Sequence, residues 1–267
     1  MSGLDLCALV WPSGADAAGA GGAGGGGGGC CVRLAPDELS VPAGGVAVVL
    51  GPVPAIRALA DVITGLIPAV SGTILVNGAD VGRLAPGRRR IGLVPAGGAL
   101  LPHRTVAGNI GFGLDGAGLS ARARRTEVRE LGALLQVHDL LEEHPDRLSP
   151  AQRLRVAAVR ALAGRPAVIL IEDRAGQVPC GPTVAAVRRQ NVAVLVLTEV
   201  AARAAAVAGS RHLVRPLDEP VSPEDEDEDE DGDGDGSEDG DGSEDRDGSE
   251  DRDGSEPTGT AARDAAG

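Results

Sequence analysis

The sequence contains no lysine: all 25 basic residues of the 267-residue chain are arginine. A site that needs the compact ammonium group of a lysine is therefore excluded, and every strong cationic contact must come from a planar guanidinium group. Aromatic residues are nearly absent as well, with one Trp, one Phe and no Tyr. Because 42% of the residues are hydrophobic, a core is still possible, and it must be built from Leu, Val, Ile and Ala.

Long apolar runs and paired cysteines are also missing. No apolar run reaches the roughly 18–20 residues of a membrane span, and the first residues lack a basic segment followed by an apolar core. The four cysteines form no Cys-x-x-Cys pair. We therefore expect reduced thiols in a cytoplasmic protein.

Charge is distributed very unevenly along the chain. Residues 218–267 contain 23 acidic and 3 basic residues, a net charge of −20, which leaves 16 acidic and 22 basic residues, a net charge of +6, in residues 1–217. The acidic segment has low complexity and repels itself, so we expect a disordered tail after an arginine-rich folded domain. A second low-complexity segment, the Gly-rich stretch at about 17–29, is expected to be a flexible insert.

The apolar patterns of residues 1–217 indicate an α/β fold. Residues 4–11, 31–51, 71–81 and 88–96 have strand and turn patterns, and residues 55–67 have apolar residues at helical spacing. A mainly helical stretch runs from Thr105 to Leu162, within a helical subdomain expected at about 97–163. Strands that alternate with helices predict a central, mostly parallel sheet.

Two continuous apolar runs, AVILIED (167–173) and NVAVLVLTE (191–199), are typical of parallel strands that are buried on both faces. Ligands of such sheets bind beyond the carboxyl ends of the strands. Gly51, Glu172 and Glu199 would all lie at that edge.

The stretch VVLGPVPAIRAL (48–59) begins like a phosphate-binding loop, with an apolar strand followed by Gly-Pro. A working loop of this kind has the pattern G-x-x-x-x-G-K-[ST]. Ile56, Arg57 and Ala58 stand where this pattern has Gly, Lys and Ser or Thr. A β-branched residue at the second Gly position would strain the tight turn.

The order of motifs resembles the ATP-binding subunit of an ABC transporter, of the type that imports small solutes. The most specific segments are LPHRTVAGNI (101–110) and LSPAQRLRVAAVRAL (148–162), and the likeness covers most of residues 1–215. It implies a P-loop NTPase-like ABC ATPase domain, with ATP and Mg²⁺ as cofactors. It also implies a head-to-tail dimer, formed with itself or with an intact paralogue, docked on a membrane permease at the inner face of the cell membrane.

Site residues follow from the resemblance position by position. Asp173 and Glu199 stand at the positions of the catalytic Glu and of the His that senses the γ-phosphate, Glu172 is the candidate Mg²⁺ ligand, and Ala96 replaces a Gln. The signature L-S-G-G-Q keeps three of its residues, but Pro150 and Ala151 replace its glycines. The signature residues are Leu148, Ser149 and Gln152, and the nucleotide-binding positions are Trp11, Gly51, Pro52, Ile56, Arg57, Ala58 and Leu59.

Two further features, Trp11 and the cluster Arg88–Arg90, each have two interpretations. Trp11 is the one candidate for an aromatic residue that stacks on adenine, and it is equally well interpreted as a half-buried strand residue. The cluster Arg88–Arg90 would suit a nucleic acid, but aromatic residues for base stacking are missing, so no nucleic-acid partner is expected.

These substitutions predict a subunit that binds ATP weakly and associates with a permease, with impaired hydrolysis. The alternative is a non-catalytic pseudo-ATPase, a scaffold or regulator that acts through its dimer face or its acidic tail. A decaying gene without a retained function is a further possibility.

Overall fold

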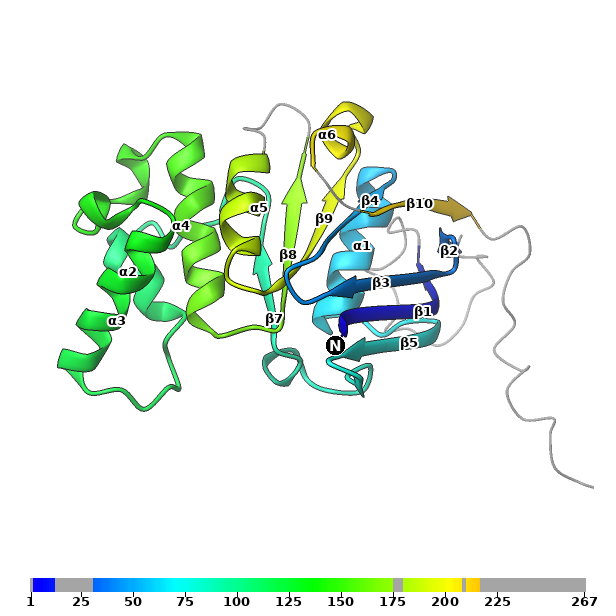
Figure 1. Ribbon diagram of the computed structural model, residues 1–267, viewed down its shortest axis with the longest axis horizontal. Helices are drawn as coiled ribbons and strands as arrows, with labels where there is room; N and C mark the ends of the chain where they lie inside the picture. Colours follow the sequence, from blue (N-terminus) through cyan, green and yellow to red (C-terminus); the bar gives the residue numbers. More distant parts are fainter. Residues whose placement is uncertain (1, 13–30, 175–179, 208–209, 217–267) are drawn as a thin grey trace, which may run out of the picture. The chain divides into compact units, whose positions relative to one another are not determined.

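The computed structural model describes residues 2–12, 31–174, 180–207 and 210–216 (Figure 1). The expected Gly-rich insert and the acidic tail lie outside these residues, as does Cys30. All described residues belong to one unit, Met1–Ser222.

A sheet of ten strands organises the described residues, and it has a parallel and an antiparallel part. The strand order is β6-β5-β1-β2-β10-β4-β9-β8-β7, with β3 paired to β1. The strands from β10 to β7 are parallel to one another, whereas the N-terminal strands pair in antiparallel fashion. The strands are β1 (Ser2–Pro12), β2 (Cys31–Ala35), β3 (Glu38–Pro42), β4 (Val46–Leu50), β5 (Ser71–Val76), β6 (Ala79–Asp80), β7 (Ile91–Val94), β8 (Val168–Asp173), β9 (Ala193–Thr198) and β10 (Ser210–Pro216).

The parallel strands are buried on both faces, as their apolar runs predict. In β8, Val168 and Leu170 belong to one apolar cluster, and Ile169 and Ile171 to the other. Side chains alternate between the two faces of a strand, so one continuous apolar run supplies both cores. The first cluster is shared with α1 and the antiparallel strands, and the second with the helices α2, α4, α5 and α6.

The carboxyl ends of the parallel strands meet in register. Leu50 of β4 pairs with Thr198 of β9, and Thr198 pairs with Asp173 of β8. Gly51, Glu172 and Glu199 therefore lie along one edge of the sheet, as the sequence predicts.

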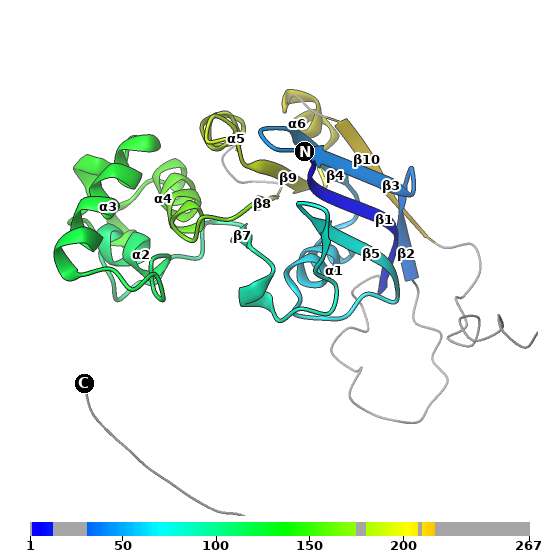
Figure 2. The same cartoon turned by 60° about the horizontal axis from the view of Figure 1, so that its bottom comes forward.

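Helix α1 and the three helices α2, α3 and α4 lie at different parts of the sheet (Figures 1 and 2). Helix α1 contacts both β1 and β9, and α2, α3 and α4 pack on one another at the β7 end of the sheet. The helices are α1 (Val53–Thr64), α2 (Val106–Phe112), α3 (Ala121–Leu134), α4 (Pro150–Ala163), α5 (Gly181–Arg188) and α6 (Ala201–Ala206), with 3-10 turns η1 (Pro86–Arg88), η2 (His138–Leu140) and η3 (Pro145–Arg147).

Buried Asn109 organises the entry to the α2–α4 group. It has no exposed surface, and its amide nitrogen donates to the carbonyls of Leu101, Arg104 and Thr105 while its oxygen accepts from the Leu101 N–H. The two N–H groups of the amide are thus shared among three carbonyls, and its oxygen accepts one hydrogen bond. The Asn of the motif LPHRTVAGNI therefore has a structural role, because its side chain holds the loop that leads into α2.

Helix α1 ends at Thr64, with Gly65 as its C-cap, whereas the helical spacing of apolar residues in the sequence continues to residue 67. Gly65 adopts φ of 86°, and the following Leu66 N–H bonds to the Asp61 carbonyl at 2.7 Å. Arg89 is buried against this end and donates to the carbonyls of Val62 and Ile63, at 2.8 and 3.1 Å. A guanidinium at a helix C-terminus satisfies its last carbonyls and complements the helix dipole. The middle arginine of the basic cluster is therefore a structural cap.

Candidate functional site

The phosphate-loop stretch is largely helical in the structure. Helix α1 begins at Val53, two residues after Gly51, and continues through Ile56, Arg57 and Ala58. The Ile56 N–H donates to the carbonyl of Pro52 at 3.0 Å, within the first helical turn. The stretch that would wrap around phosphates in a working loop is instead the first turn of a regular helix.

This helix start offers few donors to an anion. Pro52 is the N-cap, and Pro54 lies in the first turn; proline has no backbone N–H. The Gly51 N–H donates to the carbonyl of Thr198 at 3.2 Å, across to β9. Before Ile56, only Val53 and Ala55 have an N–H in the first turn, so the set of converging amides that cradles a phosphate is not formed here.

The expected strain at Ile56 is absent, and that expectation was wrong. Ile56 lies in the helix with 4% of its surface exposed, and it is not among the described residues with positive φ. The tight turn that would have strained a β-branched side chain is not made, because the helix starts before it.

The remaining nucleotide-binding candidates of α1 separate into two faces. Ala58 and Leu59 are buried in the apolar cluster beneath the sheet, whereas Arg57 is exposed. The pKa of Asp61, one turn further on, is raised overall. Burial is the largest cause, Arg57 lowers the pKa, and the negative charge of Glu172 raises it. Arg57 and Glu172 thus both lie within electrostatic reach of Asp61. Glu172, Asp173 and Glu199 form the acidic edge of the sheet, and Arg57 is the one nucleotide-binding candidate of α1 that carries a charge.

Trp11 belongs to the core. None of its surface is exposed, and its indole N–H donates to the carbonyl of Ala55 at 2.8 Å. A side chain enclosed in this way presents no free ring face on which adenine could stack. Of the two interpretations of Trp11, the strand residue agrees with the structure, and the burial is complete rather than half.

Glu172 is held by this chain's own groups. Its Oε2 accepts from the backbone N–H of Ala96 at 3.1 Å and from Arg174 at 3.2 Å. Ala96 thus contributes a backbone donor at the position where the resemblance implies a Gln side chain. The Glu172 side chain is 14% exposed and that of Arg174 30%, so this pair is shielded from solvent on most sides.

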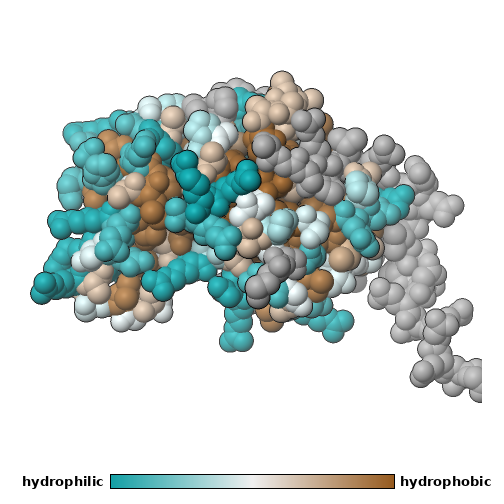
Figure 3. Space-filling model, viewed as in Figure 1, coloured by the Kyte–Doolittle hydropathy of each residue, from teal (hydrophilic) through white to brown (hydrophobic). Residues whose placement is uncertain are grey.

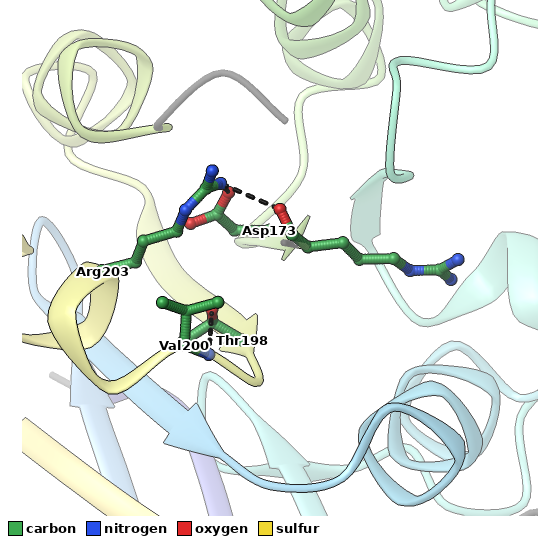
Figure 4. A network of polar contacts seen from close by, with 5 residues as sticks. Asp173, Thr198, Val200 and Arg203 are labelled. Atoms are coloured by element: carbon green, nitrogen blue, oxygen red, sulfur yellow. Dashed lines mark hydrogen bonds and ion pairs between the residues drawn. The ribbon is translucent and has the colours of Figure 1, made fainter. Parts of the chain in front are cut away.

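Asp173 is paired still more tightly (Figure 4). Its Oδ1 lies 2.6 Å from a guanidinium nitrogen of Arg203, which reaches from α6, and the same nitrogen donates to the carbonyl of Arg174 at 2.9 Å. Asp173 is 3% exposed. Burial, the negative charge of Asp173 and a hydrogen bond to it raise the pKa of the neighbouring Cys180 thiol to about 12. The Asp173 carboxylate is therefore engaged by a side chain from α6.

Glu199 and Thr198 end β9 at the same edge. Glu199 is exposed, while Thr198 is fully buried and its hydroxyl accepts from the Val200 N–H at 3.2 Å (Figure 4). This local bond turns the chain into α6. Glu199 therefore places an exposed carboxylate at this edge of the sheet.

The signature residues start α4. The Ser149 hydroxyl accepts from the Gln152 N–H at 3.3 Å, and the Gln152 side chain accepts from the Ser149 N–H at 2.7 Å. This is a capping box. Pro150 occupies the first helical position, where a missing N–H is harmless, and Leu148 is buried.

Sequence reasoning overlooked the two arginines that hold the acidic edge. Arg174 follows the carboxylate pair directly, which is a local signal. Arg203 is 30 residues from Asp173 along the chain, and only the pairing of β8 with β9 brings α6 beside Asp173.

The residues of this edge do not fit a magnesium site. Mg²⁺ requires several oxygen ligands in near-octahedral geometry, whereas Glu172 and Asp173 are each already bonded to an arginine and Ala58 has no hydroxyl. Within the described part of the chain, no three His, Cys, Asp or Glu side chains gather closely enough to hold a metal ion.

The strand order, the α2–α4 group and the acidic edge together define an ABC-type ATPase cassette. A family model described as ABC transporter matches residues 34–174, and this chain belongs to that family. Solved cassettes share the fold: a nucleotide-free ATP-binding cassette superimposes with a TM-score of 0.55 at 19% identity, covering 75% of this chain and 82% of that one. A dimeric cassette bound to ADP and phosphate gives 0.58 at 18% identity, covering 76% and 91%.

Curated relatives are import proteins by name. An sn-glycerol-3-phosphate import ATP-binding protein of Chromohalobacter salexigens is 39% identical over 51% of this chain and 37% of its own length. A molybdate/tungstate import ATP-binding protein of Archaeoglobus fulgidus is 40% identical, over 47% and 52%. A spermidine/putrescine import ATP-binding protein of Frankia alni is 40% identical, over 43% and 24%. The chain thus spans about half or less of the length of these relatives.

Proposed function

We propose that this chain is the ATP-binding-type subunit of a solute importer that associates with a membrane permease but does not itself hydrolyse ATP. The observation that carries the proposal is the early start of α1 at Val53, which replaces the phosphate loop by a proline-capped helical turn. The proposed dimer, with itself or with an intact paralogue, would place this cassette beside a second site that performs the hydrolysis.

Loss of catalysis follows from several positions that act together. Phosphoryl transfer depends on positioning and on charge stabilisation by the loop, the metal ion and the residue that orients water. Here the loop is helical, Ala58 has no hydroxyl, and Asp173 is paired with Arg203. Removing even one stabilising group of this kind costs roughly 10²–10³-fold in rate.

Nucleotide binding is proposed to be weak. The exposed Arg57 supplies a positive charge, and the first turn of α1 supplies the N–H groups of Val53 and Ala55. This is less than a full phosphate loop, and the buried Trp11 contributes no stacking. We expect a dissociation constant of about 1 mM, which corresponds to roughly −4 kcal/mol.

The partner proposal rests on the relatives' names and on the surface of the α2–α4 group. Hydrophilic side chains border apolar ones over these helices (Figure 3), and Phe112, Leu119 and Leu134 are 48%, 39% and 41% exposed. Apolar side chains at a surface are suited to a protein partner. Within the described residues no helix is long and apolar enough to cross a membrane, so the permease is proposed as a separate subunit, met at the inner face of the membrane.

The test is calorimetric titration of MgATP into the full chain, beside a steady-state assay of phosphate release. We expect a small saturable heat in the millimolar range that Arg57→Ala abolishes, and no release of phosphate above background. Arg125→Ala, which removes an exposed arginine of α3, is the matched control and should leave the heat unchanged. Turnover that Asp173→Asn abolishes would overturn the proposal. Complete absence of heat from the folded protein would favour the pure scaffold or regulator.

A further inference from the structure

The acidic edge of the sheet carries two ion pairs where an ABC cassette is expected to use a metal ion. Glu172 and Asp173 are adjacent at the end of β8, yet each bonds to a different arginine: Glu172 to Arg174 and Asp173 to Arg203. The two guanidinium groups bring two positive charges, which equals the charge of one divalent cation. The two carboxylates bring the two matching negative charges.

The arginines are bound into the fold rather than loosely attached. One nitrogen of Arg203 joins the Asp173 carboxylate, at 2.6 Å, to the carbonyl of Arg174, at 2.9 Å, and so ties α6 to the end of β8. Arg203 and Asp173 side chains are 18% and 3% exposed. Removing one partner of such a buried pair leaves an uncompensated charge, so a metal ion that displaced Arg203 would leave its guanidinium group without the Asp173 carboxylate.

We infer that Arg174 and Arg203 take the electrostatic place of the divalent cation at the Glu172–Asp173 pair, so that this cassette holds its two carboxylates without a metal. The inference deepens the proposed function, on which it rests, because it concerns the same site. In this role the carboxylates and arginines form a structural clamp between β8 and α6 instead of a cofactor site.

The test is whether a divalent cation restores the thermal stability that is lost when one of these arginines is substituted. In the full-length protein, Arg203→Met removes the guanidinium but keeps an unbranched apolar side chain. We expect its melting temperature to fall by about 10 °C, and millimolar Mn²⁺ or Mg²⁺ to restore at least half of that loss, because the cation can now neutralise Asp173. The wild-type melting temperature should not respond to either ion by more than about 1 °C.

Two controls isolate the site. The double variant Asp173→Asn, Arg203→Met should show no rescue, since the carboxylate is gone. Arg188→Met removes an arginine that donates to the Gly44 carbonyl at 2.9 Å, away from the two carboxylates, so its stability should not respond to the cations. All variants retain the same 23 acidic residues after position 217, so cations bound there cancel in the comparison.

If Arg203→Met does not fold, Arg174→Met is used in the same way, because the Glu172–Arg174 pair is more exposed and its loss is milder. The inference is overturned if wild-type protein is stabilised by Mn²⁺ and Glu172→Gln removes that effect, or if the folded arginine variant is not rescued. The proposed function fails separately: phosphate release that persists in a chelator would refute it while leaving the arginine clamp intact. Release that requires Mg²⁺ and Asp173 would refute both.

Discussion

The indole N–H of Trp11 donates a hydrogen bond to the backbone carbonyl of Ala55 across 2.8 Å, joining β1 to the first turn of α1. The bond connects two segments that the resemblance would have placed around a nucleotide, one at the adenine and one at the phosphates. In the structure they instead complete each other's packing and hydrogen bonding. Trp11, Ala55 and Ile56 are thus part of the core, whereas Pro52, Pro54 and Arg57 remain exposed.

Trp11 is the only tryptophan of the chain, so intrinsic fluorescence reports on it alone. We expect the blue-shifted emission of a buried indole, and no quenching when MgATP is added, because no ring face is free to stack. The measurement is an emission titration. Saturable quenching by ATP, absent with an equal concentration of inorganic phosphate, would show that the indole meets the base after all.

Arg89 should be among the most important arginines for stability. Arg89→Met removes a donor from the carbonyls of Val62, Ile63, Leu84 and Gly82. Val62 keeps the Gly65 N–H as a second donor, and we expect a loss of about 2–4 kcal/mol in the free energy of unfolding. Urea denaturation measures it. The exposed neighbour Arg88 provides the control, since Arg88→Met should change stability by less than about 0.5 kcal/mol.

The same contact can be disturbed from the other side. A Cβ at Gly65 would lie 2.4 Å from the Arg89 Nε, and φ there is 86°. Gly65→Ala is therefore expected to destabilise the protein by more than about 1 kcal/mol. Gly78→Ala is a comparison at another positive φ, where a Cβ meets nothing within 4 Å; if both variants lose equal stability, the Arg89 contact is not the cause.

The signature residues should behave as a helix cap. Ser149→Ala removes the acceptor of the capping box, and we expect a loss of about 1 kcal/mol. Pro150→Ala, one residue further on, should change stability by less than that, because the first helical position needs no N–H. Thermal unfolding of the two variants makes the comparison. A Pro150→Ala variant that is the less stable of the two would contradict this role.

Cys180 should make stability fall in alkaline solution. Its thiol has a pKa of about 12 in the folded protein, raised from 9.0 by burial and by Asp173. Between these values the unfolded chain loses the proton while the folded chain keeps it, so stability is fully present below pH 9 and decreases as the pH rises towards 12. Denaturation at pH 8, 9 and 10 tests this, and Cys180→Ala should reduce the slope. An equal slope in the variant would assign the effect to other groups.

Local sequence patterns were sufficient to predict the parallel half of the sheet. Apolar runs such as 167–173 can be buried on both faces only between two layers, and strands that alternate with helices then bring their carboxyl ends to one edge. The capping box at Ser149 was likewise present in the local pattern S-x-x-Q, although the resemblance directed attention to a signature motif instead.

The state of the site, in contrast, depends on contacts between segments that are far apart in the chain. Whether residues after Gly51 form a loop or a helix depends on what their side chains bury, and Ile56, Ala58 and Leu59 find an apolar cluster beneath the sheet. The partner of Asp173 depends on a contact across 30 residues, which local spacing does not encode. A motif shows which groups are present, but the free energy of packing determines whether they face a ligand or each other.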